Sequence, residues 1–175
     1  MDNALNEILW KQFGASIDML GNAVSTWPEE EWDADPNFFY QAYHCILFLD
    51  YYATTPPTHF AARLPFSLTA KDRLPKGAVD DLLPSRQYSK RELLDYLKSS
   101  REKCKKLILG LTDEKLKSVW IEKQDDLAPG FTMSYSVFEI LLYNMRHVQH
   151  HSAQLNLLLR KQINRAPNWI AGVSD

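Results

Sequence analysis

Histidines are the residues of this chain whose spacing is suited to chemistry. Three of the five, His147, His150 and His151, lie within a span of five residues. His147 and His151 are four residues apart, so on a helix they lie one turn apart on one face, where two imidazoles can share a metal ion. His150 would project about 100° away from His151. Such a pair also arises by chance, so two interpretations stay open: metal ligands, or histidines hydrogen-bonded to buried polar groups.

His44 supplies another imidazole from a different part of the chain. It lies in an apolar, aromatic segment, where Tyr40, His44 and Phe48 share a helical stripe that should face the core. This position favours metal binding. Three neutral imidazoles on zinc leave at least one coordination position open, as in catalytic sites. Such a position would lower the pKa of a bound water or deprotonate a bound thiol, so hydrolysis and thiol transfer stay equally open.

Polar residues near these histidines are candidates for orienting the imidazoles. Helical position selects Tyr40, Asn144 and Gln154 for this role. The alternative for each is a hydrogen bond between helices or at the surface that has no connection with a metal. Cys45 and Cys104 are expected to be buried small hydrophobes, and neither is expected to act as a ligand or nucleophile.

Apolar residues that recur every three or four positions predict the helices that hold these side chains. Ser89 with Glu92, and Ser136 with Glu139, have the capping-box pattern that starts a helix. Four amphipathic helices in a chain of this size predict an all-α fold, a four-helix bundle with long connections between helices. The main predicted helices cover residues 5–24, 38–52, 90–109 and 137–159, with a short additional helix within 112–119.

Two long connections separate these helices. Residues 54–86 contain five prolines, which exclude long helices and strands. Loops of this length tend to be lids, binding loops or oligomer contacts. Residues 120–133 are predicted to be a second connection. Trp120, Trp169 and the acidic pair 125–126 either line a mouth over the metal or cap the ends of the bundle.

Composition limits the class of protein. The chain has 175 residues and 20.3 kDa, the size of a single domain over residues 1–175. Its 20 Lys and Arg against 22 Asp and Glu give a net charge of -2, so no positive field attracts nucleic acid or an anionic membrane. The basic run 101–106 is therefore expected to lie on a solvated helix face. The longest apolar run, 45–49, is far shorter than the ~20 residues that span a bilayer. The N-terminus has no leader pattern and the cysteines are too few for a disulfide framework, so the expected location is the cytoplasm.

Residues 144–155 resemble the closing helix of the DinB-like (DinB/YfiT) four-helix bundle superfamily. In that family the helix carries HxxHH followed by Arg-Gly-Gln-Leu, and one histidine precedes an apolar run in the second helix, as His44 does here. Ser152 and Ala153 stand where Arg and Gly are usual. The matching positions of the closing helix are His147, His150, His151, Gln154 and Leu155.

The resemblance implies a divalent metal, commonly zinc or nickel, bound by His44, His147 and His151, with His150 free to hydrogen-bond across the bundle. Several members of the superfamily look like metal-dependent S-transferases that use low-molecular-weight thiols such as bacillithiol or mycothiol, and the resemblance also implies a homodimer. The expected function is a metal-dependent enzyme with thiol S-transferase or hydrolase chemistry. The alternative is a non-catalytic, stress-related protein that binds a metal or another ligand.

Overall fold

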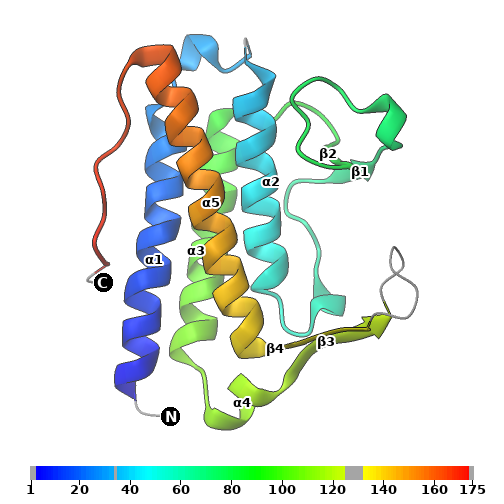
Figure 1. Ribbon diagram of the computed structural model, residues 1–175, viewed down its shortest axis with the longest axis vertical. Coiled ribbons are helices and arrows are strands. Elements are labelled where there is room, and N and C mark those ends of the chain that lie inside the picture. The colour runs from blue at the N-terminus through cyan, green and yellow to red at the C-terminus, as the bar shows by residue number, and fades with distance from the viewer. Residues whose placement is uncertain (1–2, 34, 125–131, 174–175) are drawn as a thin grey trace.

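Four long helices run side by side in the computed structural model, which describes residues 3–33, 35–124 and 132–173 (Figure 1). Both α1 and α2 pack against α3 and α5. This arrangement confirms the predicted all-α four-helix bundle. The long helices are α1 (Asn3–Thr26), α2 (Pro36–Tyr52), α3 (Lys90–Leu109) and α5 (Val137–Ile163), and α4 (Asp113–Lys117) is the short predicted helix.

The starts of the helices follow local side-chain chemistry. The Asp35 side chain accepts a hydrogen bond from the Asn37 backbone N–H, and Pro36 occupies the first turn of α2, where its missing N–H costs nothing. Both predicted capping boxes are confirmed: Ser89 starts α3 and Ser136 starts α5. The first residue of α5, and with it the register of the three histidines, is therefore fixed by a local signal.

The core lies between the four helices and is largely the one that the periodicity predicts. Phe13, Ile17 and Leu20 of α1 are fully buried. Leu5, predicted on the same stripe, is 49% exposed. Near Leu5, the residue of α1 that faces the bundle is Asn6. Its side chain is buried and donates from Nδ2 to the Leu111 carbonyl at 3.0 Å. Cys45 and Cys104 are fully buried, as predicted.

Residues 120–133, predicted only as a connection, contain regular structure in their described part. β3 (Val119–Gln124) and β4 (Thr132–Ser136) pair as an antiparallel hairpin with a register shift between Val119 and Ile121. Trp120 is 5% exposed, so a buried aromatic residue holds this hairpin against the bundle. The pair 125–126 lies outside the described residues.

The connection 54–86 contains short regular elements in place of long ones. β1 (Phe66–Leu68) and β2 (Leu82–Pro84) form a small antiparallel ladder. Short 3-10 turns cover Pro57–His59 and Lys71–Arg73, and a third, Glu29–Glu31, precedes α2. Gly77 has φ of +93°, and a Cβ at this position would meet the Asn37 side chain at 2.8 Å. The loop therefore approaches the start of α2 closely where a glycine permits it.

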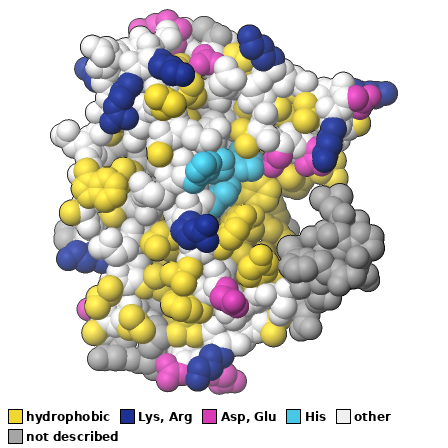
Figure 2. Space-filling view, viewed as in Figure 1, with side chains coloured by type: hydrophobic (Ala, Val, Ile, Leu, Met, Phe, Trp, Pro, Cys, Tyr) yellow, Lys and Arg dark blue, Asp and Glu magenta, His cyan; other side chains and the backbone are white. Residues whose placement is uncertain are grey.

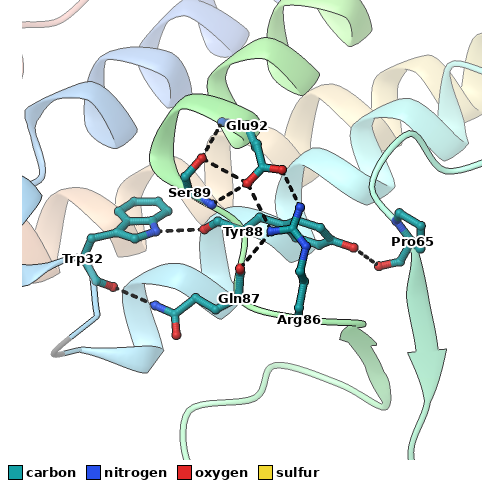
Figure 3. A network of polar contacts seen from close by, with 7 residues as sticks. All are labelled: Trp32, Pro65, Arg86, Gln87, Tyr88, Ser89 and Glu92. Carbon is teal, nitrogen blue, oxygen red and sulfur yellow. Dashed lines mark hydrogen bonds and ion pairs between the residues drawn. The ribbon is translucent and has the colours of Figure 1, made fainter.

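Hydrogen bonds fasten this connection to the bundle (Figure 3). The Tyr88 hydroxyl donates to the Pro65 carbonyl at 2.7 Å, and the Trp32 indole N–H donates to the Tyr88 carbonyl at 2.9 Å. The Tyr43 hydroxyl of α2 donates to the Leu64 carbonyl at 2.8 Å. Because residues 64–65 and Tyr88 are fixed in this way, the segment between them is held beside α2.

The basic run 101–106 is only partly a solvated face, which corrects the prediction. Arg101 forms an ion pair with Asp18 at 2.7 Å. The Lys103 ammonium contacts the buried Asp50 carboxylate, which also accepts a hydrogen bond from the Tyr96 hydroxyl at 2.8 Å. Two cations of this run therefore neutralise acidic groups on α1 and α2. None of the helices within the described ranges combines the length and apolarity needed to cross a membrane.

Candidate metal centre

Three imidazole nitrogens converge between α2 and α5. The Nε2 atom of His147 lies 3.1 Å from Nε2 of His44 and 3.0 Å from Nε2 of His151. All three ligand atoms lie within 4.8 Å of one another. The helical spacing that suggested a shared metal therefore brings His147 and His151 together, and the packing of α2 on α5 adds His44.

The spacing of these nitrogens fits one small divalent ion. Zinc binds imidazole nitrogens at about 2.0–2.1 Å, which in a tetrahedral site keeps two ligand nitrogens about 3.3 Å apart. The two Nε2 contacts of His147, at 3.1 and 3.0 Å, are close to that separation. Three imidazoles in neutral form are also a donor set that zinc, nickel and copper accept. His44, His147 and His151 would thus hold such an ion and leave further coordination positions to other ligands.

The outer nitrogen of His151 lies beside two amide side chains, of which Gln154 offers it an acceptor. Its Nδ1 lies 2.8 Å from Oε1 of Gln154. An Nδ1–H that donates to this oxygen leaves the lone pair on Nε2, the atom that faces the other histidines. The Gln41 amide contacts the same ring nitrogen and donates from Nε2 to Gln154 Oε1 at 2.7 Å. Gln154 therefore lies where the sequence predicted an orienting residue.

The outer nitrogen of His44 faces a carboxylate from the long loop. Nδ1 of His44 lies 2.9 Å from Oδ2 of Asp80. The distance is that of an ion pair, although the ring N–H is not aimed well enough for a hydrogen bond. The Leu82 backbone N–H donates to Oδ1 of Asp80 at 3.0 Å and so fixes the carboxylate. A carboxylate beside the outer nitrogen of a metal-binding imidazole orients the ring and raises its basicity.

The other predicted residues lie on the same two helices as the histidine cluster, Tyr40 on α2 and Asn144 and His150 on α5. Asn144 is buried and donates from Nδ2 to the Leu49 carbonyl at 3.1 Å, so it joins α5 to α2 one turn before His147. Tyr40 packs its ring on Phe39. His150 is exposed, and its ring centroid lies 5.1 Å from that of His151.

Burial keeps the imidazoles of His147 and His151 neutral. Desolvation, followed by the neighbouring histidines His151, His44 and His150, lowers the pKa of His147 to about 3. Desolvation also lowers the pKa of His151 to about 4, against the opposing effect of its hydrogen bond to Gln154. Metal ligation requires deprotonated imidazole nitrogens. At neutral pH His147 and His151 meet this requirement without any change in protonation.

One side of the cluster is open to solvent. Figure 2 shows the histidine patch at the surface, with a Lys or Arg side chain beside it and hydrophobic side chains next to both. A groove of about 590 Å³ lies along this side. Small molecules can therefore reach His147 directly through this groove. Its described lining residues are Tyr143, Arg146, His147, Gln149, His150 and Ala153.

Comparison with known proteins agrees with this geometry. A model of the DinB superfamily matches residues 12–155. The chain belongs to the DinB superfamily. The matched span contains all three converging histidines of this DinB protein and confirms the resemblance seen in its sequence. No curated protein and no solved structure gives a significant match to the chain.

We expect the untagged DinB protein, purified without metal affinity, to contain near-stoichiometric zinc or nickel by plasma mass spectrometry. His44→Ala, His147→Ala and His151→Ala should each lose the metal, because each removes one of three ligands. His150→Ala is the matched control and should keep it, because the His150 ring lies outside the cluster. A wild-type protein that is free of metal and takes up no added zinc or nickel would contradict this prediction.

Asp80→Asn should weaken metal binding by about 10- to 100-fold, the usual effect of removing a carboxylate beside a metal-bound imidazole. The neighbouring Asp81→Asn should change the affinity by less than about twofold, because the contact to His44 belongs to Asp80. Competition with a chromophoric zinc chelator measures both affinities. Equal affinities in the two variants would show that Asp80 does not support His44.

The metal-free protein should lose stability as the pH falls below about 6.5. The folded-state pKa values of His147 and His151, about 3 and about 4, lie below the unfolded value of about 6.5, so the unfolded chain binds more protons in this window. Each group contributes at most about 1.4 kcal/mol per pH unit, less for the half-buried His147. Urea unfolding after chelation, at pH 7 and pH 5, should show a smaller loss in His147→Gln than in the wild type. The exposed His59→Gln should behave as the wild type does, and equal losses in all three proteins would contradict the assignment.

Proposed function

We propose that this DinB protein is a metal-dependent enzyme that transfers a low-molecular-weight thiol at a zinc or nickel ion held by His44, His147 and His151. The observation that carries the proposal is the convergence of three Nε2 atoms beside an open groove. Three protein ligands with solvent access are the arrangement of a catalytic metal site, whereas structural zinc sites are closed by four protein ligands. Hydrolysis at the same site is the second candidate.

The chain's own residues position the reaction. A bound divalent ion would supply an acidic site that holds a thiol as its thiolate, or lowers the pKa of water toward neutrality. Gln154 and Asp80 hold the rings of His151 and His44 so that their Nε2 atoms face a single point. The aromatic rings of Phe48 and Tyr52 pack around His147, with centroids 5.8 Å away in both cases, and exclude water from the inner side of the cluster.

The groove suits a polar thiol that carries an anionic group. Its described lining residues include Arg146 and His150 but no carboxylate. Arg146 is exposed and suits an anionic group on the thiol. His150 is placed to accept the proton that the thiol releases, since imidazole is the side chain suited to proton transfer near neutral pH.

Cobalt substitution tests this proposal. Cobalt-loaded protein titrated with 2-mercaptoethanol should develop a thiolate-to-cobalt charge-transfer band in the near ultraviolet, because the open position accepts the sulfur. His150→Ala should retain the band, and His151→Ala should lose it together with the metal. A stoichiometric cobalt site that shows no band at saturating thiol would contradict thiol transfer. Turnover of a nitrophenyl ester by that protein would then support hydrolysis, and its absence would support the non-catalytic alternative.

A further inference from the structure

A second, smaller pocket lies next to the histidines, between α2, α5 and the β3/β4 hairpin. Its volume is about 150 Å³. A cavity of about this size holds one benzene ring. Five aromatic side chains form most of its wall, and we refer to it as the aromatic pocket: Tyr51, Tyr52, Trp120, Tyr135 and Tyr143.

The walls of the aromatic pocket are held in place by contacts of their own. The Trp120 indole N–H donates to the Thr54 carbonyl at 2.7 Å. The Trp120 ring meets the Tyr51 ring edge to face, with centroids 5.4 Å apart, and meets Tyr52 in the same way at 6.0 Å. Edge-to-face pairs with these separations are favourable. The pocket is therefore formed before any ligand enters.

The aromatic pocket adjoins the metal centre through shared residues. Tyr143 lines both the pocket and the groove beside the histidines. The His147 ring centroid lies 5.8 Å from that of Tyr52 and 6.4 Å from that of Tyr143. A group in the pocket would thus be separated from a metal ligand by the thickness of a single side chain.

The pocket and the groove differ in the charged groups of their linings. The groove contains Arg146 and His150. None of the described residues that line the aromatic pocket carries a charged group. A compartment with a cationic side chain and one without any therefore meet beside His147.

We propose that the aromatic pocket binds a flat, uncharged ring on the acceptor substrate, while the polar thiol enters through the groove. The assignment of the ring to the acceptor rests on the proposed thiol transfer, whereas the binding of the ring rests on the pocket alone. The acceptor class is thus a small molecule with a single aromatic or similarly flat ring, close to the atom that receives sulfur. Both substrates bind at once, because each occupies its own compartment.

Fluorine NMR of the zinc-loaded protein with 4-fluorobenzyl alcohol tests ring binding. A ligand of this size should bind with a Kd on the order of millimolar. Cyclohexylmethanol, which is similar in volume but not flat, should compete more weakly than benzyl alcohol. Saturating 2-mercaptoethanol should leave the Kd unchanged. Tighter binding of tetramethylammonium than of benzyl alcohol, or competition by the thiol, would overturn the proposal.

Two substitutions on one strand locate the site. Ile121→Trp fills the pocket and should weaken binding of the fluorinated probe by at least about tenfold. Val119→Trp is the matched control, because Val119 is 58% exposed and lies outside the pocket, and it should change the Kd by less than about twofold. Tyr135→Ala, which removes one wall, should also weaken binding and provides a second test if Ile121→Trp does not fold. Unchanged affinity in Tyr135→Ala and in any folded Ile121→Trp would overturn the proposal.

Comparison of cobalt-loaded with zinc-loaded protein separates this proposal from the proposed function. Cobalt should accelerate fluorine relaxation of the bound probe, because the pocket adjoins His147. Probe binding without relaxation enhancement in a cobalt-loaded protein would place the ring elsewhere and overturn the inference while leaving the thiol site intact. A protein that binds the probe with the expected dependence on Tyr135 but shows no thiolate band would retain the pocket and lose thiol transfer.

Discussion

Three imidazole nitrogens that face one another at about 3 Å form the constraint on which the rest of this structure depends. Each imidazole directs a lone pair or an N–H group into the shared space. Because the site is half-buried, little water is available to hydrogen-bond these groups. A divalent ion satisfies all three lone pairs at once. The bundle must therefore hold three rings in one orientation, and much of the polar structure around them serves this purpose.

The bundle supplies position and the connections supply orientation. The Asn144 amide joins α5 to the Leu49 carbonyl of α2, so the helices that carry the histidines are held together close to the cluster. The loop between α2 and α3 brings Asp80 to His44, and the Tyr43 and Tyr88 hydroxyls fix residues 64–65 of this loop. The β3/β4 hairpin adds Trp120, which closes the aromatic side. The segments between the helices thus supply several of the side chains that surround the three histidines.

Patterns of residues three or four positions apart were sufficient to predict the long helices, the capping boxes and the pair His147 and His151. His44 followed from its place on an apolar stripe and from the family resemblance. Gln41 shares the face of His44 at a spacing of three and contacts His151, yet the larger Tyr40 was the residue selected. The contact of Asp80 with His44 was not predicted, because the loop has no regular periodicity to indicate which of its side chains contacts the bundle. The pairing of β3 with β4 was not predicted, because it joins residues of two separate segments and not residues three or four positions apart. A homodimer and a cytoplasmic location stay predictions.

Zinc K-edge X-ray absorption of the loaded protein, with and without a small thiol, tests most directly whether this is a three-histidine centre with an open position. The account predicts three imidazole nitrogens at about 2.0–2.1 Å and one exchangeable light atom, which is replaced by sulfur at about 2.3 Å when thiol is added. A first coordination sphere of four protein ligands that thiol does not alter would contradict it, as would a zinc ion without three imidazoles.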